Sequence, residues 1–171
     1  QVGCEGHTIR IAERATRRYG INQNYDNIDV WPLVQPVIGQ GKVLYFAGCM
    51  TQLTPRIRKA MESVLTKAGV DYSFLDKDGG LCCGRPMLTA GRFPQARQLI
   101  QKNEAMILGS GAKTLVLSCP ICYKIFREHY NIPGVRVVHH SEYLLELVTA
   151  GCLKLIPSAT PYVYHDPCEL G

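Results

Sequence analysis

The sequence predicts an α/β fold in which a mainly parallel β-sheet carries helices on both faces. Short apolar runs, typical of buried strands, alternate with longer segments of helical periodicity. Cysteines follow directly after several of these runs, as expected for loops at the carboxyl ends of parallel strands. The chain has 171 residues, 46% of them hydrophobic and 19% charged, which is enough for one globular core.

The first predicted strand is KVLYFAG, residues 42–48, an apolar run followed directly by Cys49. The next helix begins at Thr54 and Pro55, because Thr is a common N-cap and Pro fits the first helical position. Gly69 ends this helix. Its periodicity predicts one buried face that carries Ile57, Ala60, Met61, Val64, Leu65 and Ala68.

The second strand is predicted at residues 70–75, where Val, Tyr and Phe alternate with other residues. A loop, DKDGG, then leads to the adjacent Cys82 and Cys83 in LCCGRP. A helix follows at residues 94–108, and its periodicity predicts four inward side chains, those of Ala96, Leu99, Ile100 and Ile107.

The second half of the chain continues the alternation of strand and helix. TLVLS, residues 114–118, is the third predicted strand, and Cys119-Pro120-Ile121-Cys122 opens the helix after it. The later predicted elements are a strand at residues 135–140, a helix from Ser141 to Val148 and a fifth strand at residues 162–165.

The chain divides into three predicted segments. Residues 1–40 contain a basic helix and an irregular connector, and we expect them to come from an upstream domain. Residues 41–160 form the first complete module. VLYFAGC (43–49) and YVYHDPC (162–168) share the order strand, short turn, cysteine, so residues 161–171 are predicted to begin a second, truncated copy. The chain does not begin with an initiator residue, and we expect it to be a piece of something longer.

The composition excludes several classes of protein. Eight cysteines in 171 residues fall below the density of a disulfide-stapled miniprotein. No apolar run approaches the roughly 18 residues of a membrane span, and no signal peptide opens the sequence. The net charge of +5 is interpreted as a solvated surface. Metal or redox chemistry is therefore the expected role of the cysteines.

Five cysteines are predicted to meet at one edge of the sheet, because they follow the first three strands: Cys49, Cys82, Cys83, Cys119 and Cys122. Zinc fits this set weakly, since five thiolates overfill a tetrahedral site and only one pair has zinc spacing. A disulfide exchanger would use C-x-x-C at the helix start but leaves three thiols unexplained. An iron–sulfur cluster fits best, because adjacent cysteines can bind different iron atoms.

FAGCM, LCCGRP and SCPIC together resemble the CCG or cysteine-rich domain family. That family includes the catalytic subunit of heterodisulfide reductase of methanogens and iron–sulfur subunits of quinone-linked glycolate, lactate and glycerol-3-phosphate dehydrogenases. The resemblance covers residues 42 to about 150. It implies a noncubane [4Fe-4S] cluster bound by the five cysteines, and it implies that Cys168 is the first ligand of a second cluster.

The resemblance implies an iron–sulfur subunit of a multi-subunit electron-transfer oxidoreductase that reduces a disulfide. Electrons would come from iron–sulfur or flavin partner subunits, and no nucleic-acid partner is expected. Two alternatives stay open: an electron relay in a quinone-linked dehydrogenase, and a zinc-stabilised interaction module. The expected location is the cytoplasm, at the inner face of a membrane where partners attach it.

His165 is the candidate catalytic residue, because it lies three positions before Cys168. An imidazole there would supply a proton to a leaving thiolate near the second cluster. The alternative is a histidine that is simply hydrogen-bonded at the end of a strand.

Overall fold

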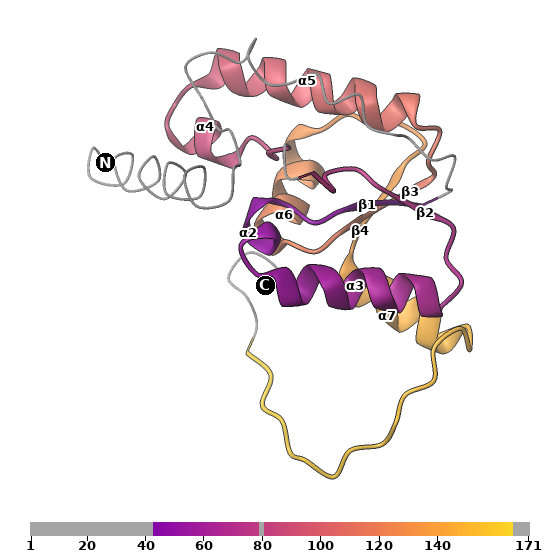
Figure 1. The fold of residues 1–171 in the computed structure, drawn as a ribbon. Helices are drawn as coiled ribbons and strands as arrows, with labels where there is room; N and C mark the ends of the chain where they lie inside the picture. Colours follow the sequence, from indigo (N-terminus) through magenta and orange to yellow (C-terminus); the bar gives the residue numbers. More distant parts are fainter. Residues whose placement is uncertain (1–42, 79–80, 166–171) are drawn as a thin grey trace.

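A computed structural model describes residues 43–78 and 81–165 and shows a four-stranded, all-parallel sheet (Figure 1). The strand order is β2-β1-β3-β4. Main-chain pairing joins β1 to both β2 and β3, and β3 to β4. The strands are β1 (Val43–Phe46), β2 (Tyr72–Phe74), β3 (Thr114–Leu117) and β4 (Arg136–His139).

Helices cover both faces of the sheet, which confirms the predicted fold class. α3 (Pro55–Lys67) and α7 (His140–Thr149) pack on one face, where Met61, Leu65 and Leu147 meet Tyr45. α5 (Phe93–Gly109) and α6 (Pro120–His129) cover the other (Figure 1). The strands alternate accordingly: Leu44 and Phe46 belong to the α5–α6 core, and Val43 and Tyr45 to the α3–α7 core.

The strand order places a topological switch point at β1. The chain passes from β1 to its neighbour β2 by way of α3, then crosses β1 by way of α5 to form β3 on its other side. In open parallel sheets, ligands bind outside the carboxyl ends of the strands at such a point. Both loops that leave β1 and β3 carry cysteines: Cys49 follows β1, and Cys119 follows β3.

Two short helices, which were not predicted, begin in the cysteine-containing loops. They are α2 (Cys49–Gln52) and α4 (Arg85–Thr89). A glycine with positive φ precedes each one, Gly48 at 80° and Gly84 at 94°, and L side chains rarely adopt this conformation. The glycine of LCCGRP therefore turns the chain sharply after the two adjacent cysteines.

The predicted buried face of α3 is partly wrong. Met61 and Leu65 are buried and Val64 and Ala68 are partly buried, but Ile57 is 46% exposed and Ala60 is also exposed. The cause is a difference in length, since thirteen helical residues extend about 20 Å whereas the four of β1 extend about 13 Å. The first turns of α3 therefore extend beyond the strands.

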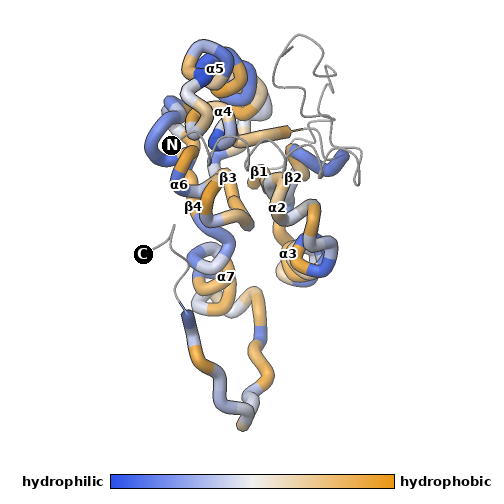
Figure 2. The backbone as a smooth tube through the Cα atoms, turned by 90° about the vertical axis from the view of Figure 1, so that its left-hand side faces the viewer, coloured by the Kyte–Doolittle hydropathy of each residue, from blue (hydrophilic) through white to orange (hydrophobic). Residues whose placement is uncertain are grey.

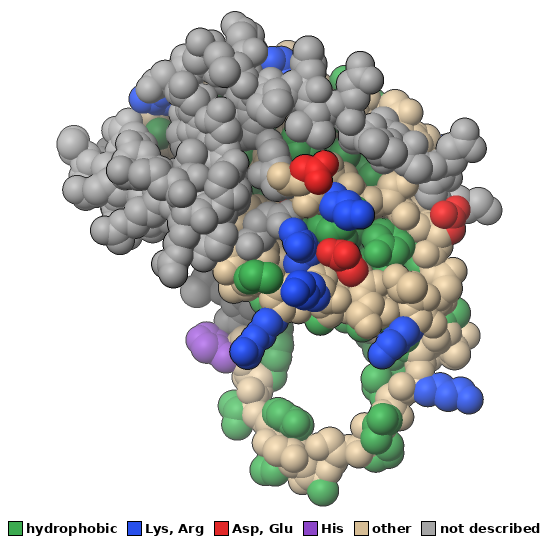
Figure 3. Space-filling view, viewed as in Figure 1, with side chains coloured by type: hydrophobic (Ala, Val, Ile, Leu, Met, Phe, Trp, Pro, Cys, Tyr) green, Lys and Arg blue, Asp and Glu red, His purple; other side chains and the backbone are tan. Residues whose placement is uncertain are grey.

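The predicted fifth strand at residues 162–165 is also wrong. This segment has no strand pairing, and the described sheet contains only the four strands above. A strand needs a neighbour for its backbone N–H and C=O groups, and alternating apolar residues do not supply one. Beyond α7 the tube runs out as a loop away from the sheet (Figure 2). Hydrophobic side chains project from it (Figure 3), among them the highly exposed Ile156, Tyr162 and Val163.

Several predictions concern residues outside the described ranges. The basic helix and the connector of residues 1–40 lie there, and so does Cys168. None of the helices in residues 43–78 and 81–165 is long and apolar enough to cross a bilayer.

Candidate metal centre

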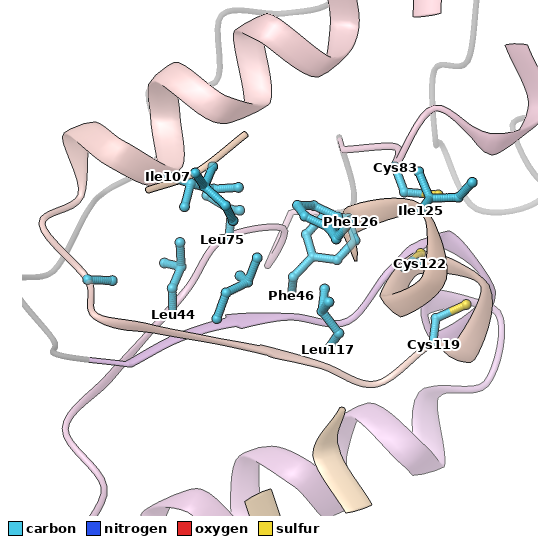
Figure 4. Packing of buried hydrophobic residues seen from close by; sticks show 13 residues of the cluster. Leu44, Phe46, Leu75, Cys83, Ile107, Leu117, Cys119, Cys122, Ile125 and Phe126 are labelled. Carbon is cyan, nitrogen blue, oxygen red and sulfur yellow. The ribbon is translucent and has the colours of Figure 1, made fainter. Parts of the chain in front are cut away.

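The structure brings five cysteines together beyond the carboxyl ends of β1 and β3. Cys49 is the first residue of α2, Cys119 is the N-cap of α6, and Cys122 lies in the first turn of α6. Cys82 and Cys83 approach them from the loop before α4. Figure 4 shows Cys83, Cys119 and Cys122 at one end of the core between the sheet and the helices.

Four of these thiols are almost completely buried, and they contact one another. Cys83 is hydrogen-bonded to both Cys82 and Cys122, and Cys122 also to Cys119. A side chain at Gly48 would place its Cβ 2.9 Å from the Cys122 sulfur and 3.2 Å from the Cys119 Cβ, so only glycine fits. The exposed fractions are 0% for Cys82, 3% for Cys83, 4% for Cys119 and 1% for Cys122. Cys49 is partly exposed, at the outer side of the group.

Two of the thiols are set up to ionise. The pKa of Cys83 lies well below its usual value, chiefly because Cys122 and then Cys82 donate hydrogen bonds to its sulfur. The pKa of Cys119 is lowered by a hydrogen bond from Cys122, and backbone amides at the start of α6 add to this. Thiolates are the form of cysteine that binds metal, so both residues suit a ligand role.

The other three thiols hold their protons more tightly. A hydrogen bond to Cys83 raises the pKa of Cys82, and a hydrogen bond to Cys119 raises the pKa of Cys122. Burial raises both pKa values further. Burial raises the pKa of Cys49 to about 12. Metal binding at these positions would therefore release protons.

Asp76, which the sequence analysis treated as part of a loop, is a structural element of the site. Its carboxylate is 2% exposed and accepts hydrogen bonds from the backbone N–H groups of Ala47 at 2.8 Å and Gly48 at 2.7 Å. These two amides belong to the turn between β1 and Cys49. Asp76 thereby ties the end of β2 to the turn that presents Cys49.

A second polar pair, also missed in the sequence, lies behind the adjacent cysteines. Asn103 of α5 donates a hydrogen bond to the Cys82 carbonyl at 2.9 Å. Tyr130, the C-cap of α6, donates one to the Cys83 carbonyl at 3.2 Å. The signal for Asn103 was present, because it falls on the same helical face as the predicted core residues Leu99 and Ile107. Burial raises the pKa of Tyr130 and keeps its phenol a donor.

Two histidines lie at the same edge of the sheet. His139 ends β4 and accepts a hydrogen bond from the Ser141 backbone, and His140 begins α7. Burial lowers the pKa of both, that of His140 to about 4, so both rings are neutral at pH 7. His165 is exposed on the loop after α7.

The five thiols do not form the site of a single metal ion. Within the described residues, no three His, Cys, Asp or Glu side chains converge so as to hold one metal ion. The cysteines nevertheless form an all-sulfur, buried set carried by three loops, with Gly48 leaving space against Cys122. Thiolate ligands of this kind are those of iron–sulfur clusters, whose several irons require only one or two protein ligands each. The residues present fit such a group.

Comparison with known proteins agrees with this donor set. Residues 43–127 match the model of the cysteine-rich domain, CCG. The chain is 31% identical over 75% of its length to EtfAB:quinone oxidoreductase of Syntrophomonas wolfei subsp. wolfei, covering 19% of that protein. It is 27% identical over 75% of its length to a subunit of the dihydromethanophenazine:CoB–CoM heterodisulfide reductase of Methanosarcina barkeri, covering 34% of that relative.

A third relative is the probable iron–sulfur-binding oxidoreductase of Bacillus subtilis, 28% identical over 82% of the chain and 21% of the relative. The chain thus spans between a fifth and about a third of the length of these relatives. No solved structure matches it significantly. The chain is distantly related to heterodisulfide reductase subunits and iron–sulfur oxidoreductases, and its residues 43–127 belong to the cysteine-rich CCG domain family.

Proposed function

We propose that the chain is an iron–sulfur subunit of an electron-transfer oxidoreductase, and that it binds one noncubane-type [4Fe-4S] cluster. The proposed ligands are Cys49, Cys82, Cys83, Cys119 and Cys122. The observation that carries this proposal is the meeting of five thiols from three loops at the switch point of the sheet. When bound, such a cluster supplies one-electron transfer.

The surroundings of the adjacent cysteines support a cluster over a single ion. Cys82 packs in a small core with Met87, Ala96 and Leu99, whereas Cys83 belongs to the core that contains Cys119 and Cys122. The two sulfurs are nevertheless hydrogen-bonded to each other, so the adjacent thiols enter one site from two different cores. Two thiols held in this way suit two different irons better than one.

For the chemistry of the complete protein we propose reduction of a disulfide, as the relation to a heterodisulfide reductase subunit suggests. The net change is that the S–S bond accepts two electrons and two protons and yields two thiols. Redox partner subunits carrying iron–sulfur or flavin groups would supply the electrons. We further propose that residues 41–160 form the first CCG domain, and that Cys168 begins the ligand set of a second one, with His165 beside it as a proton donor.

A second candidate function is electron relay toward quinone. The relative at 31% identity, named as a quinone oxidoreductase, favours it. For both candidates we propose a location in the cytoplasm, where thiols stay reduced, at the inner face of a membrane where partner subunits attach the chain. The complete complex distinguishes them, since only the first predicts that electrons from the donor reduce a disulfide.

The first experiment measures iron, sulfide and zinc in the anaerobically purified chain, together with its electron paramagnetic resonance spectrum. About four irons with matching sulfide per chain are expected. Cys83→Ala should abolish the cluster signal and lower the iron content. Cys152→Ala is the matched control, because that cysteine is exposed and outside the site. Zinc without sulfide, or a Cys83→Ala variant with wild-type iron and spectrum, would contradict the proposal.

A further inference from the structure

A buried polar pair links two helices to the backbone of the adjacent cysteines. Asn103 is 2% exposed, and its amide nitrogen lies 2.9 Å from the Cys82 carbonyl oxygen and 2.8 Å from the Tyr130 hydroxyl. The Tyr130 hydroxyl in turn donates to the Cys83 carbonyl oxygen at 3.2 Å. Each of two successive peptide carbonyls therefore has its own donor from a different helix.

Packing alone does not account for an asparagine at position 103. It lies on the apolar face of α5, whose other buried members include Leu99, Ile100 and Ile107. A buried amide there is costly unless hydrogen bonds compensate, and the side-chain oxygen of Asn103, Oδ1, is buried with no hydrogen-bond partner among the described residues. An apolar residue would complete this face without that cost. The contacts of Asn103 point instead to a role at the cysteine turn.

The ring of Tyr130 is packed against a neighbouring ring. Its ring stacks on that of Phe126 with centroids 3.9 Å apart and planes 20° apart. The hydroxyl can thus keep a fixed position against the Cys83 carbonyl. On the other side of the same turn, the Gly84 backbone N–H donates to the Cys82 sulfur at 3.4 Å.

We propose that Asn103 and Tyr130 are positioning residues that hold the peptide groups of Cys82 and Cys83, and so fix the directions in which the two thiols are presented to the metal centre. The inference rests on the proposed function for the identity of that centre. The physical basis of the proposal is the geometry of the peptide groups. Hydrogen bonds that fix the Cys82 and Cys83 carbonyls restrain the neighbouring φ and ψ angles, and these angles set the directions of the Cα–Cβ bonds of both cysteines. Adjacent ligands for different irons need this restraint, because a change in one peptide plane redirects both thiols.

The test removes one hydroxyl and keeps the ring: Tyr130→Phe in the full chain, with Asn103→Leu as the second variant. Tyr123→Phe is the matched control, since Tyr123 lies on α6 and, among the described residues, its hydroxyl bonds the exposed Arg127 and Glu142 rather than the cysteine backbone. The first readout is the alkylation rate of each cysteine in the metal-free chain, measured by mass spectrometry. The second is the electron paramagnetic resonance signature of the chain after cluster reconstitution.

Tyr130→Phe removes two hydrogen bonds, one from Asn103 and one to the Cys83 carbonyl. We therefore expect Cys82 and Cys83 to be alkylated roughly five- to a hundredfold faster through local opening, with Cys122 and Cys119 unchanged. The resonance signature should shift in this variant and not in Tyr123→Phe. Unchanged rates, equal acceleration of all five cysteines, or an unshifted signature would overturn the proposal. If the wild-type chain takes up no iron, the proposed function fails, and the alkylation pattern alone decides whether the pair restrains the two thiols.

Discussion

Asp76→Asn tests the anchor of the turn that presents Cys49. The carboxylate of Asp76 is buried and accepts two short hydrogen bonds, from Ala47 at 2.8 Å and Gly48 at 2.7 Å. An amide in its place keeps one acceptor oxygen, but its NH₂ group faces the second backbone N–H. One charge-assisted hydrogen bond is lost, and one buried donor is left without a partner.

The cost follows from these two contributions. A hydrogen bond to a charged group contributes about 1.5–3 kcal/mol, and an unpaired buried donor costs about 1–3 kcal/mol. Burying a neutral amide is easier than burying a carboxylate, which offsets part of the sum. We therefore expect the free energy of unfolding of the metal-free chain to fall by about 2–4 kcal/mol.

The assay is urea unfolding under anaerobic, reducing conditions, followed by circular dichroism. Asp78→Asn is the control, because Asp78 is exposed in the same loop and undergoes the same chemical change. Iron uptake should fall in Asp76→Asn alone, since the turn before Cys49 loses its anchor. If the two variants unfold within about 0.5 kcal/mol of each other, the reasoning about Asp76 is refuted.

Two further predictions concern the metal-free chain. Gly48→Ala combines a positive φ of 80° with a Cβ that would lie 2.9 Å from the Cys122 sulfur, so it should lower the free energy of unfolding by about 1–3 kcal/mol and reduce iron uptake. Gly69→Ala, with φ of 67° and an added Cβ that meets no non-neighbouring atom of the described residues within 4 Å, should show the backbone strain but normal iron uptake. Burial, and then the neighbouring His139, lower the pKa of His140 to about 4. The imidazole of His140 therefore takes up a proton at a higher pH in the unfolded chain than in the folded one, and the free energy of unfolding falls as the pH drops from about 6.5 to 4. Acid titration of His140→Gln should show a smaller loss of stability than wild type; an equal loss would contradict this assignment.

Much of the fold could be predicted because its elements carry strong local signals. The apolar runs that form β1 and β3 are buried between two helical layers, the run that forms β4 is buried over its second half, and α5 buries all four residues predicted for its inner face. The five cysteines also meet at one edge of the sheet, as expected from their positions after the first three strands, since loops at the carboxyl ends of neighbouring parallel strands share one edge. Their role as cluster ligands stays a prediction.

The polar supports of the site could not be predicted, for a physical reason. Asp76, which anchors the turn before Cys49, lies in a loop whose sequence is typical of an exposed turn. Its hydrogen-bond partners are the backbone amides of Ala47 and Gly48, which are distant in the chain. Every residue except proline has a backbone N–H group, so the residue type of the partner does not indicate that it donates such a hydrogen bond. The strand predicted at residues 162–165 was wrong for a different reason. The alternation of apolar residues is a local signal, but a strand also needs a neighbouring strand to pair with, which a single segment does not reveal.

The parallel arrangement of the sheet has a consequence for how a metal centre is assembled in the cell. β1 and β3 are adjacent in space but distant in the chain, as the bond between the Tyr45 and Ser118 hydroxyls, 73 positions apart, illustrates. Such non-local pairings form slowly, after the intervening chain has been synthesised and ordered. No early fragment from the ribosome contains the complete set of thiols in proximity. Under the proposed function, iron and sulfide would therefore be delivered after folding, to the folded edge of the sheet rather than to a linear peptide.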